Sequence, residues 1–147
     1  MEFFPEIPVV VDAIQRDRLP TMANILLIDD DTMLTEMLTE HLDRAGHCTT
    51  TAATLNDGIE QARNGSFDIV FLDVQLPDGD GLQAFPRFSE APSKPEIIIM
   101  TGAVLPPEDS EACNEYHFPI LEKPFLAEQV LAVVRERLQR SSTATSA

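Results

Sequence analysis

The sequence predicts an α/β domain in which a five-stranded parallel sheet is covered by helices on both faces. Short apolar runs that suit buried strands alternate along the chain with segments in which apolar residues recur at helical spacing. Acidic, hydroxyl or amine side chains follow several of these runs at their C-terminal ends. In open sheets of this class, ligands bind at that edge. One pattern therefore predicts both the fold and the position of a site.

The length and charge of the chain narrow the possible functions. With 147 residues, it is long enough for one domain with a sizeable core. Its net charge of −15 argues against direct binding to nucleic acid or to an anionic membrane surface. No apolar run is long enough to cross a bilayer, and the N-terminus lacks the basic residues of a secretory signal. Cys48 and Cys113 are expected to be free thiols, which predicts a cytoplasmic location.

Five segments are expected to form the strands. The run at 24–28 ends in three aspartates, and the run beginning at Ile69 ends at Asp73, before a stretch rich in turn residues. The β-branched segment at 47–51 suits an edge strand. Pro119 makes the last segment another edge strand, because proline cannot donate to a sheet. The expected strands are 24–28, 47–51, 69–72, 95–101 and 118–121.

Helices are expected between these strands and after the last one. Asp31 should cap the first helix and Gly46 should follow its end. Pro86 should kink or shorten the third helix, whereas Pro107 suits the first turn of the fourth. The expected helices are 32–45, 54–64, 81–89, 108–116 and a last helix beginning near Leu126.

The two ends of the chain are expected to lie outside the domain at 23–140. Residues 1–22 are interrupted by prolines and read as a poorly ordered extension, although a short helix at 11–18 is an alternative. Met22 precedes the first strand, so it is also a candidate for the natural start of translation. The small residues of 141–147 predict a disordered tail.

The residues at the strand ends indicate phosphoryl chemistry. If Asp29, Asp30 and Asp73 converge, their mutual repulsion requires a cation, and carboxylate oxygens favour Mg²⁺. Thr101 supplies a hydroxyl and Lys123 a compact ammonium suited to an anion. Asp73 stands alone at a central strand end, which makes it the expected nucleophile for an aspartyl phosphate.

These pieces together resemble the receiver domain of response regulators, the CheY-like phosphoacceptor module of two-component signalling. The resemblance covers residues 23 to about 140. It rests on ILLIDDD, FDIVFLDVQLPDGDGL, IIIMTGA and LEKPF, which are specific in this order and spacing. It implies a flavodoxin-like (βα)5 fold with five parallel strands in the order 2-1-3-4-5.

The resemblance also implies a role for each site residue. Asp73 would accept a phosphoryl group from a histidine kinase or a histidine phosphotransfer protein. Mg²⁺ would be bound by Asp29, Asp30, Asp73 and the backbone carbonyl of Gln75. Thr101 and Lys123 would bind phosphoryl oxygens, and the bond between Lys123 and Pro124 would be cis, as is usual in the family.

The sequence departs from the family pattern near its last strand. Ile120 occupies the position, three residues before the lysine, where the family usually has Tyr or Phe as part of a conformational switch. The usual Gly-Ala turn before this strand is also missing. Switching is therefore expected to be atypical, with Tyr116 or Phe118 as hypothetical substitutes for the aromatic residue.

Two alternatives to a phosphoacceptor remain. A receiver-like scaffold would bind partners without being phosphorylated. A Mg²⁺-dependent phosphatase of the haloacid-dehalogenase type would also use an aspartyl phosphate, but its Asp-x-Asp-x-Thr motif does not fit Asp29–Met33, in which the Thr comes one place early. The sequence favours a single-domain response regulator, not a classical enzyme, that signals through an unknown downstream protein. It does not indicate the pathway, the phosphoryl lifetime or the oligomeric state.

Overall fold

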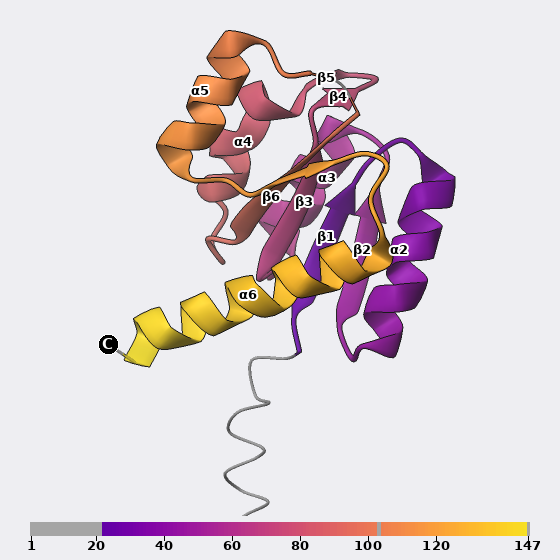
Figure 1. Ribbon diagram of the computed structural model, residues 1–147, viewed down its shortest axis with the longest axis vertical. Helices are drawn as coiled ribbons and strands as arrows, with labels where there is room; N and C mark the ends of the chain where they lie inside the picture. The colour runs from indigo at the N-terminus through magenta and orange to yellow at the C-terminus, as the bar shows by residue number, and fades with distance from the viewer. Residues whose placement is uncertain (1–21, 103, 147) are drawn as a thin grey trace, which may run out of the picture.

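A five-stranded parallel sheet forms the centre of the molecule, as the computed structural model of residues 22–102 and 104–146 shows (Figure 1). Its order is β2-β1-β3-β6-β7, which is the predicted order 2-1-3-4-5 once a small separate hairpin is set aside. Of the extension expected at 1–22, residues 1–21 lie outside the described residues. The strands of the central sheet are β1 (Asn24–Ile28), β2 (Cys48–Ala52), β3 (Ile69–Asp73), β6 (Glu96–Thr101) and β7 (Ile120–Glu122).

Helices cover both faces of the sheet. Within the described residues they are α2 (Thr32–Arg44), α3 (Leu55–Asn64), α4 (Gly81–Ser89), α5 (Pro107–Tyr116) and α6 (Ala127–Ser146). Strand residues such as Leu27, Phe71 and Ile98 pack in one core with α2 and α6. Their neighbours in sequence, such as Leu72 and Ile99, face a second core under α3, α4 and α5. Because successive side chains of a strand point to opposite faces, the largely apolar strands β1, β3 and β6 supply both cores.

Most predicted helix signals act as expected. Asp31 caps α2 by accepting a hydrogen bond from the backbone N–H of Leu34 at 3.2 Å. Pro107 is the first residue of α5. Pro86 lies inside α4, which nevertheless continues to Ser89. Helix α6 runs to Ser146, so its backbone enters the segment 141–147 for which composition predicts a disordered tail.

Two strand predictions shift in position. The strand predicted at 118–121 begins at Ile120, after Pro119 instead of across it. Proline lacks an N–H, but the carbonyl of Pro119 still accepts a hydrogen bond from Ile99 at 2.9 Å. The edge strand predicted at 47–51 is displaced by one residue and is β2.

A short hairpin links β3 to α4 and was not expected from the sequence. Its strands, β4 (Gln75–Leu76) and β5 (Gly79–Asp80), pair antiparallel within a stretch that the sequence predicts only as a turn. Asp78 lies between them and accepts hydrogen bonds from Leu55 and Asn56 at 2.7 and 2.9 Å. These bonds satisfy free N–H groups at the start of α3, and they lower the pKa of Asp78. The hairpin is thereby tied to a helix on the same face of the sheet.

Gly81 allows α4 to approach the end of β3 very closely. Its N–H donates to the carbonyl of Val74 at 2.8 Å, and a Cβ at this position would lie 2.2 Å from the carbonyl oxygen of Asp73. Since that obstacle is backbone, it cannot rotate away as a flexible side chain would. Replacing Gly81 therefore requires β3 and α4 to separate.

We predict that Gly81→Ala lowers the free energy of unfolding by about 3 kcal/mol, the upper end of the usual cost of overpacking. The measurement is urea denaturation followed by circular dichroism. Gly102→Ala is the matched control, because its added Cβ would meet only Lys123 side-chain carbons, at 3.8 and 4.0 Å. Equal unfolding midpoints for the two variants would contradict the prediction.

Candidate functional site

The predicted site residues converge at the C-terminal edge of the sheet. Asp29 follows β1, Asp73 is the last residue of β3 and Thr101 is the last residue of β6. Thr101 pairs with Glu122 in β7, and its carbonyl accepts a hydrogen bond from the backbone N–H of Lys123 at 2.7 Å. The parallel register therefore brings residues from four strand ends to one place.

Three carboxylates form the acidic part of the site. Asp29, Asp30 and Asp73 each offer an oxygen, and these oxygens lie within 4.8 Å of one another. Asp29 and Asp73 are buried, with exposed fractions of 2% and 5%, whereas Asp30 is exposed. The cluster is thus anchored in the interior and open on one side.

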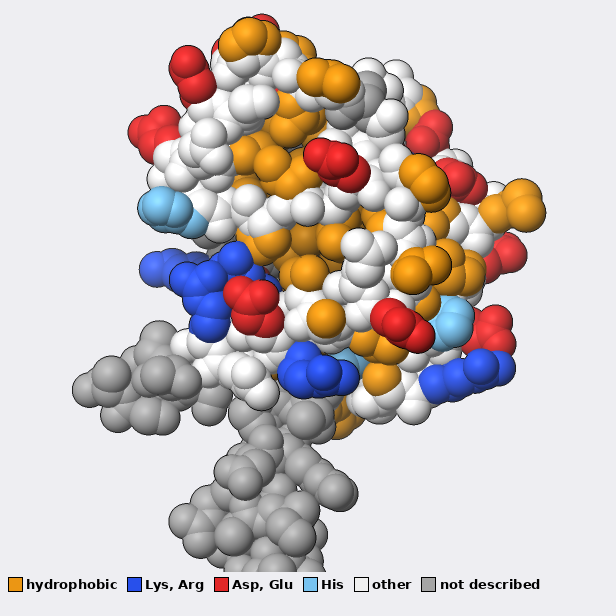
Figure 2. Space-filling view, in the orientation of Figure 1, with side chains coloured by type: hydrophobic (Ala, Val, Ile, Leu, Met, Phe, Trp, Pro, Cys, Tyr) orange, Lys and Arg blue, Asp and Glu red, His pale blue; other side chains and the backbone are white. Residues whose placement is uncertain are grey.

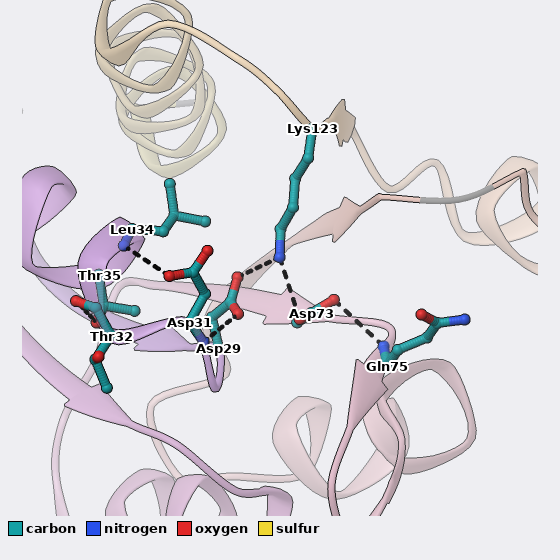
Figure 3. Close-up of polar contacts among 8 residues, drawn as sticks. All are labelled: Asp29, Asp31, Thr32, Leu34, Thr35, Asp73, Gln75 and Lys123. Carbon is teal, nitrogen blue, oxygen red and sulfur yellow. Dashed lines mark hydrogen bonds and ion pairs between the residues drawn. The ribbon is translucent and has the colours of Figure 1, made fainter.

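The Lys123 ammonium reaches both buried carboxylates (Figure 3). Its Nζ lies 2.6 Å from Asp29 Oδ2 and 3.3 Å from Asp73 Oδ2. The peptide bond between Lys123 and Pro124 is cis, as the resemblance implies. Lys123 is therefore a cation held within the acidic cluster instead of a solvated surface charge.

Backbone N–H groups orient the two buried carboxylates. Asp29 Oδ1 accepts a hydrogen bond from the N–H of Asp31 at 2.9 Å. Asp73 Oδ1 accepts a longer one from the N–H of Gln75 at 3.3 Å (Figure 3). Thr101 is buried, with 4% of its surface exposed, at the end of the neighbouring strand. The site is thus built on rigid strand ends and the turns that follow them.

Burial and like charge perturb the acid–base chemistry of the site. Burial is the largest cause that raises the pKa of Asp73, and the nearby charge of Asp29 adds to it. Lys123 and the N–H of Gln75 act in the opposite sense, and the resulting pKa is about 6. Burial alone lowers the pKa of Lys123, but Asp29 and Asp73 outweigh burial and leave that pKa raised. The single positive charge of Lys123 is therefore shared between two buried carboxylates and does not neutralise both of them.

The donor set fits a hard divalent cation. Three carboxylates supply only oxygen, and His and Cys are absent from the cluster, as suits Mg²⁺. The lone Lys123 ammonium faces two buried carboxylates and leaves a negative excess. An added cation would offset that excess and lower the pKa of Asp73. The arrangement can therefore bind a cation beside a carboxylate that is itself able to act as a nucleophile.

Sequence reasoning missed the contribution of Asp78. It is not part of the acidic cluster, but its two hydrogen bonds to the start of α3 fix the hairpin that follows Asp73 and Gln75. The sequence contained one local signal, an Asp in a turn next to glycine. Its partners are more than twenty residues away, so that signal did not identify them.

Ile120, at the position where the family usually has an aromatic switch residue, lies close in sequence to a group of three aromatic side chains. Ile120 is 39% exposed on the edge strand β7. Next to this strand, Tyr116 and Phe118 stack with ring centroids 5.6 Å apart, and Phe85 of α4 contacts both rings. The aromatic residues at the end of α5 thus pack against α4.

Comparisons with known proteins agree with this geometry. The chain is 27% identical to the uncharacterized transcriptional regulatory protein YkoG of Bacillus subtilis over 83% of this chain and 54% of that protein. It thus spans about half the length of that relative. A CheY-like receiver domain protein from Methanospirillum hungatei has a TM-score of 0.77 and 23% identity, covering 84% of this chain and 98% of that one.

A second solved structure is closer in sequence. The BeF3-activated receiver domain of DrrB, from Thermotoga maritima, is 28% identical with a TM-score of 0.69, over 80% of this chain and 98% of that domain. A sequence model of the response regulator receiver domain matches residues 25–135. Receiver domains are typically phosphoacceptors, not classical enzymes, and they imply a cognate histidine kinase. The chain belongs to the response regulator receiver domain family and carries the phosphorylation site of two-component signalling.

Proposed function

We propose that this protein is a response regulator in which Asp73 accepts a phosphoryl group from a histidine kinase or a histidine phosphotransfer protein. The observation that carries the proposal is the contact of Lys123 with the buried Asp29 and Asp73 beside the exposed Asp30. The DrrB receiver domain, which is BeF3-activated in its solved structure, supports the analogy. The phosphorylated protein would signal through contacts with another protein, as a single domain or as part of a longer regulator.

Each site residue has a distinct role in this reaction. An Asp73 carboxylate oxygen attacks phosphorus, the phosphorus–nitrogen bond of the phosphohistidine breaks, and an acyl phosphate forms. Lys123 and the Thr101 hydroxyl bind the phosphoryl oxygens. Mg²⁺, when bound, offsets the charge of the transferred group. Asp29, Asp30, Asp73 and the carbonyl of Gln75 would hold that ion.

Lys123 would change partners during the reaction. Before transfer its ammonium contacts two carboxylates, and one of these, Asp73, becomes an acyl phosphate. The phosphoryl oxygens then replace the Asp73 carboxylate as the anion beside it. A flexible stem with a compact charge suits this exchange better than the fixed fork of arginine would.

We also propose that the missing aromatic residue at Ile120 alters how the phosphorylated state is transmitted. The Tyr116 and Phe118 rings pack with Phe85 of α4 and are not part of β7 itself. A change at Thr101 would therefore reach α4 and α5 without an aromatic side chain on β7 as the intermediary. A structure with a bound phosphoryl mimic in which Thr101 stays in place would exclude altered switching.

The first of three predictions from the proposed function concerns phosphate uptake. Incubation with acetyl phosphate and Mg²⁺ should add one phosphoryl group to the protein, measured as intact mass. Asp73→Asn and omission of Mg²⁺ should each abolish the gain, while Asp43→Asn, in the last turn of α2, should retain it. No gain in the wild type would favour the scaffold alternative, and steady hydrolysis of a phosphomonoester would favour the phosphatase.

The second prediction concerns the metal. Asp30→Asn should weaken Mg²⁺ binding at least about tenfold, a loss seen even when only supporting groups around a metal are removed. Because Asp30 is exposed, the variant should remain folded. Binding can be followed by isothermal titration calorimetry, with Asp43→Asn as the control. Unchanged Mg²⁺ affinity in Asp30→Asn would remove this residue from the proposed metal site.

The third prediction follows from the pKa of Asp73, which is raised from 3.8 to about 6 without metal. The folded protein then holds this proton more tightly than the unfolded chain does. The contribution of protonated Asp73 to the free energy of unfolding is therefore fully present below about pH 4, and it is lost as the pH rises through 6.

In metal-free buffer, the wild type should lose about 1–2 kcal/mol of unfolding free energy relative to Asp73→Asn between pH 4 and pH 7.5, allowing for partial solvation. Urea denaturation across this range measures the difference. Saturating Mg²⁺ should reduce it, because the cation favours ionised Asp73. Parallel pH curves for the two proteins would contradict the pKa shift.

A further inference from the structure

A buried cation lies near the N-terminal ends of the strands, away from the acidic cluster. Arg137 of α6 is only 9% exposed. Its Nε is fully buried without a hydrogen-bond partner, and among the described side chains no ion pair to its guanidinium is found within 4.0 Å. A buried guanidinium without an anion is costly, so such a group indicates a ligand.

Arg137 and Glu96 line both of two neighbouring cavities. One has a volume of about 280 Å³ and is lined by Ile97, Tyr116, Phe118 and the exposed Arg140, among others. The other has a volume of about 320 Å³ and includes Lys94. The buried guanidinium therefore borders both spaces, each larger than a water molecule needs.

The charges around the cavities favour a singly charged anion. Three lining residues are cationic, namely Arg137, Arg140 and Lys94, against two acids, Glu96 and Asp68. One Asp68 oxygen already accepts a hydrogen bond from Asn24. In a protein with a net charge of −15, this local excess of positive charge is unusual. Figure 2 shows Lys and Arg side chains gathered beside a His on this side of the molecule.

A smaller part of the mostly polar lining of the first cavity is apolar. The stacked rings of Tyr116 and Phe118 line it together with Ile97. A guanidinium presents a planar fork that matches a carboxylate, and the aromatic rings would cover an apolar body attached to it. A dianionic phosphate fits less well, because Glu96 lines both cavities.

We propose that the cavities beside Arg137 bind a small carboxylate with an apolar body. Glu96 is the first residue of β6 and Thr101 is the last. The length of this strand therefore places the proposed site roughly 20 Å from the phosphoacceptor edge. The site is separate from the acidic cluster, and binding here does not depend on the proposed phosphorylation of Asp73.

Benzoate is the probe for this proposal. Titration of the full ¹⁵N-labelled chain at constant ionic strength should give saturable shifts of the Glu96, Ile97 and Phe118 amides. Acetate should bind the same residues more weakly, because it lacks the apolar body, and phosphate should bind more weakly than benzoate. Absence of saturable shifts, or tighter binding of phosphate, would overturn the assignment.

Single substitutions can distinguish binding at this site from a general effect of removing a positive charge. Arg137→Gln should weaken benzoate binding at least tenfold, while Arg87→Gln, on α4 and outside both cavities, should leave it unchanged. If Arg137→Gln does not fold, Arg140→Gln at the exposed rim should still weaken binding several-fold. Glu96→Gln should strengthen it, because a competing negative charge is removed.

Two further results would overturn the proposal. If Arg137 and Glu96 simply pair in solution, Glu96→Gln would destabilise the fold and benzoate would not bind. If a second copy of the chain occupied the cavities, the protein would form a dimer that Arg137→Gln dissociates in analytical ultracentrifugation. Asp73→Asn should leave benzoate binding intact, so a failure of this proposal is distinguishable from a failure of phosphorylation.

Discussion

The placement of two buried carboxylates beside one ammonium is the constraint on which the site depends. Asp29 follows β1 and Asp73 ends β3. These strands are parallel neighbours, so their register holds the two buried carboxylates close together. Lys123, from the edge strand's end, contacts both. Removing Lys123 would leave two buried carboxylates without their cation, which is strongly destabilising. Because one cation cannot balance both acids and Asp30 as well, the site retains an affinity for further positive charge.

Much of this arrangement could be predicted because its signals are local. The apolar runs of β1, β3 and β6 are each followed or closed by a polar residue, namely Asp29, Asp73 and Thr101. Parallel strands align their ends, so Asp29, Asp73 and Thr101 had to approach one another once the strands were identified. The capping of α2 by Asp31 was likewise predictable, since an N-cap acts within its own turn.

The features that the sequence did not predict depend on partners distant along the chain. Asp78 looks like an ordinary turn residue until α3 is placed beside the hairpin. The shift of β7 past Pro119 depends on which backbone groups β6 leaves available. Arg137 follows Val134 at helical spacing, but spacing alone cannot tell whether a cation covers an apolar core with its stem or lies buried in it.

At each end of the parallel strands, charged side chains lie in the protein interior and need a partner of opposite charge. The two ends differ in where that partner comes from. At one end, Lys123 has carboxylate partners supplied by two strands, so the chain itself compensates the buried charge. At the other end, Arg137 lines two cavities and has no such partner among the described side chains. A guanidinium cannot lose its charge to relieve burial, as a lysine can. The proposed carboxylate ligand would supply the counter-ion that Arg137 lacks among the described side chains.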